Sequence, residues 1–347
     1  MNKKTKILLN VFLTLFGGVF IGAYIIQHIL KLPLNDRETE IYINTNSKFD
    51  SVYKLLLEKD LIKNEKLFFI VSKLKSFPDL VKPGYYIIPS QCNMVELVNL
   101  LRSGSQFPVN ITFNNIETIE QLAQKISIQI EEDSTALYLA FTDEIFIKNN
   151  NFSTENITCM FLPNTYEVYW TNEASSIREK LLGEYYFFWN DSRIKKAKNI
   201  GLSKTEVSIL ASIVEKETIK TDEMSVVAGL YLNRLKKGWK LQSDPTVIYA
   251  IKKDINNDTI IKRVLFSDLK HKSPYNTYMY NGLPPGPICI PSVKAIDAVL
   301  NAKTHNYMYM CASVERFGYH EFAANSSQHT KNRKKYIAWL NSQKIHR

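Results

Sequence analysis

The chain is 347 residues long, and its 44 basic and 34 acidic side chains give a formal net charge of +10. This length leaves room for two or three domains, and the ordinary proportions of apolar and charged residues exclude collagen-like and disordered classes. The positive charge fits an acidic polymer, an anionic membrane surface or nucleic acid as a partner.

An apolar segment at residues 7–30 predicts a transmembrane helix. It contains no Asp, Glu, Lys or Arg, and at about 1.5 Å per residue it can cross a bilayer core of about 30 Å. Three lysines in the leader, residues 1–6, place the N-terminus in the cytoplasm by the positive-inside rule. A cleavable signal peptide is the alternative, but its apolar core is usually shorter, and no small-x-small site precedes Lys31. We therefore expect an uncleaved, single-pass anchor in the cell inner (plasma) membrane. The rest of the chain would be periplasmic or otherwise extracytoplasmic, which argues against nucleic acid.

Residues 31–38 are predicted to form a polar tether, and residues 39–106 a small α+β domain. Apolar alternation, helical spacing, and turn and capping residues place five elements in this domain. The order of the first four, strand, two helices and strand, is that of a LysM-like module, a small carbohydrate-binding fold. The five elements are a strand at 40–44, helices at 49–57 and 65–74, a strand at 85–88, and a helix at 93–101.

Residues 107–347 are predicted to form a helix-rich α+β domain. It begins with a strand and a helix within 109–128, and the polar, Asn-rich stretch 129–158 is predicted to be irregular. Long helices then dominate, and basic residues followed by a glycine end the last of them. These helices are predicted at 175–197, 203–218 and 222–237.

The helix predicted at 203–218 carries a carboxylate on its apolar face. Ser203 and Glu206 form a capping-box pattern before an apolar run. At about 100° per residue, branched aliphatic side chains flank Glu217, whereas Glu215 projects toward serines on the polar side. An acid in apolar surroundings has a raised pKa, and enzymes use such acids to protonate poor leaving groups at neutral pH. The alternative is a structural ion pair with a basic side chain, which also perturbs the pKa.

Polar and turn motifs follow this helix. Asp244, with Pro245 after it, is predicted to cap a helix, and capping alone would explain its presence. The segment 274–278 mixes aromatic faces with amide and hydroxyl groups, a composition suited to binding sugars. The proline-fixed loop 281–287 can wall a groove or merely turn the chain.

No metal site is predicted. His320 and His329 lie nine residues apart, unlike the usual zinc spacing, and no third ligand is evident. The cysteines show no CxxC pair and are expected to behave as small buried apolar residues, with one disulfide as the alternative. They are Cys92, Cys159, Cys289 and Cys311.

Five motifs together resemble the endolytic murein transglycosylases, the MltG or YceG-like family. Their order and separations agree with the family, and the anchor and the LysM-like segment lie where the family has them. The resemblance therefore covers nearly the whole chain. The motifs are ASIVEKET (211–218), LQSDPTVIYA (241–250), SPYNTY (273–278), GLPPGPI (282–288) and GYHEF with NSSQH (318–329).

The resemblance implies cleavage of the bond between N-acetylmuramic acid (MurNAc) and N-acetylglucosamine (GlcNAc) in nascent peptidoglycan, with a 1,6-anhydro product and no metal or organic cofactor. The family's catalytic acid matches Glu217, the residue that the helix-face pattern also selects. Glu217 would protonate the leaving oxygen and then take the proton of the muramic acid C6 hydroxyl. The motifs further suggest substrate-binding residues: Gln242, Ser243, Asp244, Tyr275, Asn276, Thr277, Tyr278, Gly282, Leu283, Pro284, His320, Asn325 and His329.

Two segments depart from the family pattern. Asn114 and Asn115 stand where the family commonly has Glu-Gly, and residues 158–166 read TCMFLPNTY where the family tends to read EGxxxPDTY. The loss of three acids and two glycines indicates a relaxed groove or altered turn geometry. Because the other motifs are intact, activity is still expected.

By the resemblance, the partners are peptidoglycan glycan strands and the peptidoglycan synthases, whose strand length such an enzyme would limit. Two alternatives stay open. One is a non-catalytic glycan-binding or scaffold protein of the cell-wall synthesis machinery. The other is a lysozyme-like hydrolase, which would place water at the cleaved bond.

Overall fold

The computed structural model describes residues 3–255, 261 and 264–343. The chain divides into two compact units. The first runs to Asn110 and includes the short segments 129–131 and 167–172, and the second holds the remainder. The first two residues of the predicted leader and the last four of the predicted C-terminal domain lie outside the described residues.

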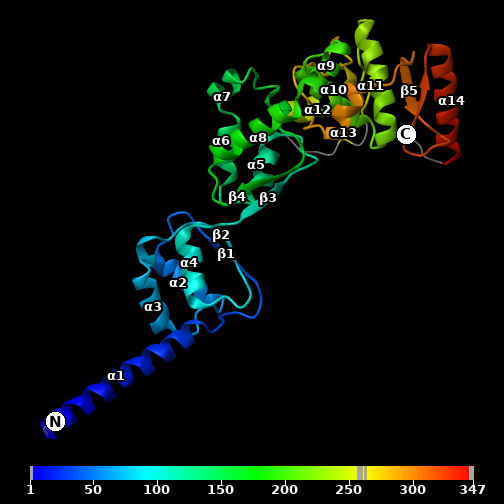
Figure 1. Cartoon of the computed structure of the whole chain (residues 1–347). Helices are drawn as coiled ribbons and strands as arrows, with labels where there is room; N and C mark the ends of the chain where they lie inside the picture. Colours follow the sequence, from blue (N-terminus) through cyan, green and yellow to red (C-terminus); the bar gives the residue numbers. More distant parts are fainter. Residues whose placement is uncertain (1–2, 256–260, 262–263, 344–347) are drawn as a thin grey trace. The chain divides into compact units, whose positions relative to one another are not determined.

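The first unit begins with the helix α1 (Lys3–Leu30), which contains the segment predicted to span a membrane (Figure 1). It is long and apolar enough to do so, and its most apolar stretch is not buried by the rest of the chain. An apolar helix left uncovered is costly in water, so its composition fits a lipid environment.

The rest of the first unit has the predicted order of strand, two helices, strand and helix. The two strands are antiparallel, with Thr39 opposite Ile88 and Ile43 opposite Gly84. The Asn93 side chain caps the last helix in a capping box, and Gly104 ends it at φ +74°, in the left-handed region that glycine adopts without strain. The likeness to a LysM module stays a prediction. The elements are β1 (Thr39–Ile43), α2 (Phe49–Glu58), α3 (Glu65–Leu74), η1 (Phe77–Asp79), β2 (Gly84–Ile88) and α4 (Met94–Ser103).

The stretch predicted to be irregular is largely helical, so that prediction is wrong. Asp133 and Asp143 each cap a short helix by accepting hydrogen bonds from backbone N–H groups of its first turn. Leu137 and Phe141, one helical turn apart, are fully buried. The capping aspartates were the overlooked sequence signal. The elements here are β3 (Pro108–Thr112), α5 (Ile119–Ser127), α6 (Ser134–Phe141), α7 (Glu144–Asn149), η2 (Ile157–Met160) and β4 (Thr165–Tyr169), with β3 paired to β4.

The helix predicted at 175–197 is two helices, α8 (Ala174–Phe188) and α9 (Asp191–Asn199). The chain leaves the helical conformation at Trp189, and the Asn190 side chain caps the second helix by accepting from the N–H of Arg193 at 3.1 Å. The tryptophan side chain is buried. A side-chain cap in the middle of a continuous helical pattern therefore starts a new helix.

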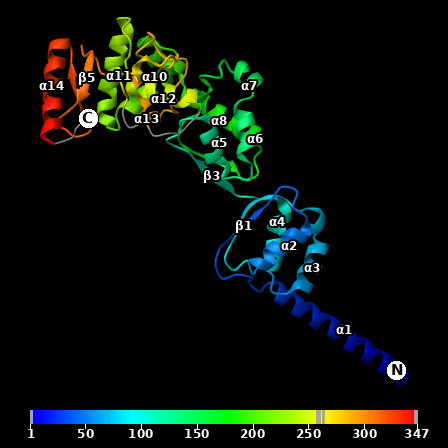
Figure 2. The same ribbon diagram turned by 180° about the vertical axis from the view of Figure 1, so that it is seen from behind.

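The core of the second unit is built around α10 (Lys204–Glu217), whose residues from Val207 to Val214 are all buried. The predicted capping box is present, with Ser203 accepting from the N–H of Glu206. The helix packs against α11 and α13, and both views place these helices together (Figures 1 and 2). The remaining elements are α11 (Thr221–Lys236), α12 (Asp244–Ile255), η3 (Asp268–Lys270), α13 (Val293–Leu300), β5 (Tyr309–Ala312), β6 (His320–Ala323) and α14 (Ser326–Ser342).

The antiparallel strands β5 and β6 bring the C-terminal motifs back to this core. Tyr309 lies opposite Ala323, and α14 packs beside the strands (Figure 2). The hairpin that joins the strands contacts the start of α11, because the Tyr319 hydroxyl donates to Asp222 at 3.1 Å. His320, the first residue of β6, is thereby placed beside α11.

Candidate active site

The carboxylate of Glu217 lies at the C-terminal end of α10 and accepts hydrogen bonds from two hydroxyl groups. Tyr231 of α11 donates to Oε1 at 2.6 Å, and Ser243, which precedes α12, donates to the same oxygen. Tyr231 and Ser243 are buried, while Glu217 is half-buried. Both donors engage one oxygen, so the other oxygen, Oε2, receives no hydrogen bond from the described part of the chain.

Burial raises the pKa of the Glu217 carboxyl. The hydroxyls of Ser243 and Tyr231 and the charge of His320 oppose this rise, and the nearby charge of Asp244 adds to it. The net effect favours the neutral acid. A carboxyl group in this state can donate a proton at neutral pH.

The ion-pair alternative for Glu217 finds no support, because no basic side chain in the described ranges lies within 4 Å of its carboxylate. The neighbouring acid has a different environment. Glu215 Oε2 accepts from the backbone N–H of Ser292 at 2.5 Å, just before the first turn of α13. A carboxylate at a helix N-terminus is favoured by the helix dipole, so Glu215 holds α13 in place.

A second acid, Glu223 on α11, is paired with His320. Its carboxylate accepts from the backbone N–H of His320 at 2.7 Å and contacts the imidazole Nδ1 at 2.9 Å. Burial favours the neutral form of each group, but the hydrogen bonds between them prevail, so the pKa of Glu223 is lowered and that of His320 is raised. The charge of Glu217 also raises the pKa of His320, so the pair lies within electrostatic reach of Glu217.

Ser243 is held by contacts on both sides of its backbone. Its N–H donates to Thr277 Oγ1 at 3.0 Å, and that hydroxyl also contacts Thr246 Oγ1 at 2.8 Å. The buried guanidinium of Arg234 donates to the carbonyl of Leu241, two residues earlier. These contacts fix the serine hydroxyl against Glu217.

Asp244 is the first residue of α12, so the helix begins at this residue and not after it. Its carboxylate accepts from the Tyr278 hydroxyl at 2.6 Å. The charge of Glu217 contributes to a raised pKa of Tyr278, after burial and the contact with Asp244. The predicted residues Ser243, Asp244 and Tyr278 therefore lie together around Glu217.

The proline-rich loop is fixed by a close backbone approach at Gly286. A Cβ atom at this position would lie 1.8 Å from the carbonyl oxygen of Glu155, so no side chain fits without a shift of the backbone. Gly282 has φ +83°, and Pro284 is buried while Leu283 is half-buried. A glycine is needed at Gly286 for packing.

Other predicted site residues have structural contacts. Asn276 is buried and donates to the carbonyl groups of Leu269 and His271. Asn325 caps α14 by accepting from the N–H of Gln328 at 2.9 Å, and His329 stacks on Tyr309. Gln242, at φ +51°, donates its backbone N–H to Thr277, and Tyr275 is buried. A substrate contact for any of them stays a prediction.

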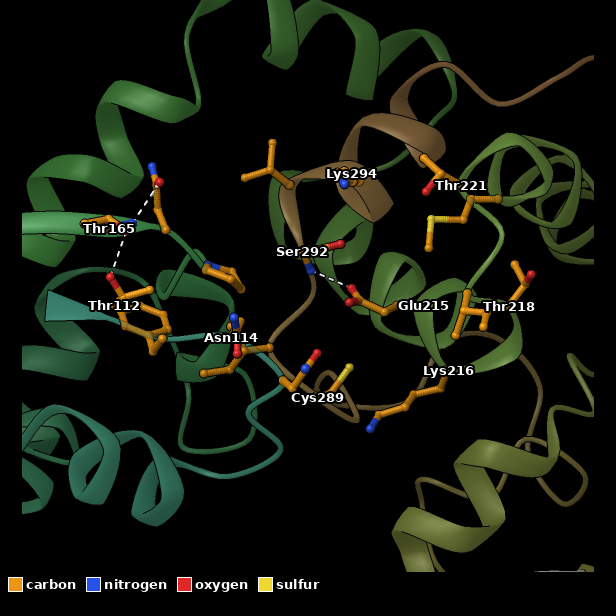
Figure 3. A pocket seen from close by; sticks show the side chains of 18 residues that line it. Thr112, Asn114, Thr165, Glu215, Lys216, Thr218, Thr221, Cys289, Ser292 and Lys294 are labelled. Carbon is orange, nitrogen blue, oxygen red and sulfur yellow. Dashed lines mark hydrogen bonds between the residues drawn. The ribbon is translucent and has the colours of Figure 1, made fainter. Parts of the chain in front are cut away.

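A pocket of about 710 Å³ lies beside the last turn of α10 (Figure 3). Thr218, the residue after Glu217, lines it together with Glu215 and Lys216, whereas Glu217 does not. The pocket therefore adjoins the acid without containing it. No group of three His, Cys, Asp or Glu side chains within the described ranges could hold a metal ion.

The sequence of the chain matches the YceG-like family over residues 41–335. The chain belongs to the YceG-like family. A solved YceG-like protein of Listeria monocytogenes has the same fold, with a TM-score of 0.55 and 24% identity over 85% of this chain and 98% of that chain.

Two relatives named endolytic murein transglycosylase are similar over most of the chain. The protein of Streptococcus pneumoniae serotype 2 is 29% identical over 93% of this chain and 63% of its own length. That of Bacillus subtilis is 28% identical over 94% of this chain and 92% of its own length. The chain thus spans less than two thirds of the pneumococcal relative.

Both segments that depart from the YceG-like pattern meet in the pocket. Asn114 and Asn115 follow β3, Asn164 precedes β4, and all three line the pocket wall. The Asn164 side chain accepts from the N–H of Thr165 at 2.9 Å, and Asn115 has φ +52°. Asn114, Asn115 and Asn164 therefore share one surface beside α10.

Three buried residues of α11 near the site were missed by the sequence analysis: Glu223, Tyr231 and Arg234. No motif marks them, and each acts through a contact with a residue distant in the sequence. The one available signal was the presence of acidic, phenolic and basic side chains on a helix whose other buried positions are apolar or small.

Proposed function

We propose that the chain is an endolytic peptidoglycan lytic transglycosylase that cleaves the MurNAc–GlcNAc bond of glycan strands and leaves 1,6-anhydro-MurNAc ends. The observation that carries this proposal is the Glu217 carboxyl, whose pKa is raised by burial and whose Oε1 accepts from Tyr231 and Ser243. Membership of the YceG-like family and the names of the relatives support the choice of substrate.

In the first step, neutral Glu217 gives its proton to the glycosidic oxygen. Because both hydroxyl donors contact Oε1, Oε2 is the oxygen that can carry the proton and meet the leaving group. The bond from the muramic acid C1 to that oxygen breaks as the proton arrives, and the GlcNAc unit leaves with a new hydroxyl.

In the second step, Glu217 acts as a base. The C6 hydroxyl of the same muramic acid ring attacks C1 and gives its proton to the carboxylate, which restores the neutral acid. The attack is intramolecular, so proximity replaces an activated water and a second carboxylate. The hydroxyls of Tyr231 and Ser243 stabilise the carboxylate between the steps, because hydrogen bonds to an ionised acceptor are strong.

The substrate would contact the exposed or half-exposed groups around this acid. Asp244 and Tyr278 present an acid and a phenol, and His320 presents an imidazole held by Glu223. The loop at 282–284 would wall the groove. Six further residues remain predicted substrate contacts, but several of their polar groups already form hydrogen bonds within the protein. They are Gln242, Tyr275, Asn276, Thr277, Asn325 and His329.

The chain would work at the outer face of the plasma membrane, where nascent strands are made. We place α1 across the membrane with the N-terminus in the cytoplasm, because the lysines of its first turn precede its apolar segment. The domain at 39–106 would be LysM-like and bind glycan, and peptidoglycan synthases would be the partners whose products the enzyme shortens.

Product analysis tests the proposed activity. Purified glycan strands are incubated with the full chain, and the new ends are identified by mass spectrometry. We expect anhydro ends, and we expect Glu217→Gln to abolish them. Reducing ends that carry water would establish a lysozyme-like hydrolase instead. Binding without cleavage would establish a scaffold protein, and unchanged anhydro release by the variant would remove Glu217 from the mechanism.

A further inference from the structure

The pocket beside the last turn of α10 has a chemical character that the proposed cleavage does not use. Its lining combines three asparagine side chains, those of residues 114, 115 and 164, with apolar residues that include Phe113 and Ile290. Figure 3 shows Asn114, Ser292 and Lys294 around the same open space. Amide groups beside apolar side chains suit a ligand with amides and short aliphatic side chains.

The charges of the pocket favour an anionic ligand. Lys216 is paired with Glu117 at 2.5 Å, and Glu215 is engaged by the N–H of Ser292. Lys294 is exposed, and no carboxylate of the described residues lies within 4 Å of it. Of the two lysines that line the pocket, Lys294 is therefore the one without a carboxylate partner among the described residues.

A glycan strand stripped of its peptide offers this lysine only the lactyl carboxylate attached directly to the muramic acid ring, and no peptide amide. The peptide branch of peptidoglycan differs, because it combines amide bonds, alanine methyl groups and free carboxylates. The branch is attached to the muramic acid ring whose C1 is cleaved, so it must leave the active site within a few bonds of the acid. Thr218, adjacent to Glu217 in the chain, lines the pocket.

We propose that this pocket binds the peptide branch of the muramic acid unit, with Lys294 contacting a branch carboxylate and Asn114 and Asn164 contacting branch amides. The inference rests on the proposed function, since it assigns the substrate's branch to a place next to the same acid. It makes the enzyme selective for peptide-bearing strands over strands stripped of peptide.

The test compares kcat/KM on two glycan preparations of the same strand length, one with its peptides and one stripped by an amidase. We expect the full chain to prefer peptide-bearing strands by about tenfold, the effect of one charge-assisted contact. Lys294→Gln and Asn164→Ala are each expected to reduce that preference severalfold. Lys294→Arg keeps the charge and should retain most of it.

Lys195→Gln on α9 is the matched control, because it removes an exposed lysine that does not line the pocket. It should leave the preference unchanged. Equal cleavage of both preparations by the unmodified chain would overturn the branch pocket and leave the transglycosylase intact. An equal loss on both preparations in Lys294→Gln would also overturn it. Absence of cleavage on both would instead refute the proposed function.

Discussion

The Tyr231 hydroxyl donates to Glu217 Oε1 at 2.6 Å, across the interface between α10 and α11. This bond opposes the rise of the Glu217 pKa that burial causes. The ionised form is needed as the base of the proposed second step, and the neutral form as the acid of the first. Tyr231 therefore adjusts the balance between the two forms of one side chain.

Replacing Tyr231 with Phe should shift this balance toward the neutral acid. The pKa of Glu217 rises further, so the alkaline fall of activity moves to higher pH. The carboxylate also loses a donor, and we expect kcat to fall about tenfold, the size of one hydrogen bond to a charged group. The measurement is the pH profile of anhydro-product release. Tyr280→Phe, at an exposed tyrosine, is the control. An alkaline limb that stays in place would show that Tyr231 does not act on Glu217.

Glu217→Gln should stabilise the fold at neutral pH. The folded pKa is raised, so the wild-type chain loses stability as the pH rises from the unfolded value of about 4.3 through the folded value. Glutamine has no such penalty, and its carbonyl can still accept from both hydroxyls. The Tm of the variant should exceed that of the wild type at pH 8, and the difference should vanish near pH 4.

Glu215→Gln is the matched control for this experiment. Its carboxylate lies at the N-terminus of α13, where negative charge is favourable. Its removal should lower the Tm at pH 8, the opposite sign to Glu217→Gln. The same sign for both variants would contradict the distinction between the two acids.

The sequence determined the helix that carries Glu217, because capping boxes and apolar periodicity are local signals. The sequence motifs also predicted Ser243, Asp244 and Tyr278 as site residues. The roles of Tyr231 and Glu223 were not predicted, since they depend on which residues contact them from α10 and β6. Such contacts join residues far apart in the chain, and periodicity cannot identify them. The two helices capped by Asp133 and Asp143 were not predicted, because each is too short to show a clear helical spacing of apolar residues.

Glu223→Gln should destabilise the chain most strongly in a window of mildly acidic pH. The lowered pKa of Glu223 gives stability that is present above about 4.3 and lost as the pH falls through the folded value. The raised pKa of His320 gives stability that is complete below about 6.5 and lost as the pH rises through the folded value. Both contributions are present between these limits.

At pH 6 the loss should be on the order of 2 kcal/mol, since the buried side chain gives up its charge-assisted hydrogen bond with the His320 imidazole. At pH 9 the loss should be smaller. Denaturant unfolding at the two pH values measures it. Glu315→Gln, which breaks an exposed ion pair with Lys335, should change little at either pH. A loss independent of pH would show that the pair is not ionised.

Gly286→Ala tests whether the proline-rich loop is fixed by packing. The added Cβ would lie 1.8 Å from the carbonyl oxygen of Glu155, so the loop or its neighbour must move. We expect a destabilisation of about 3 kcal/mol, the upper range for overpacking, together with loss of activity if the loop walls the groove. Gly183→Ala is the control, because its Cβ meets open space in the middle of α8, where alanine should stabilise by about 1 kcal/mol. Thermal unfolding of both variants gives the comparison, and a Gly286→Ala chain as stable as the wild type would mean that the approach of Glu155 is not required.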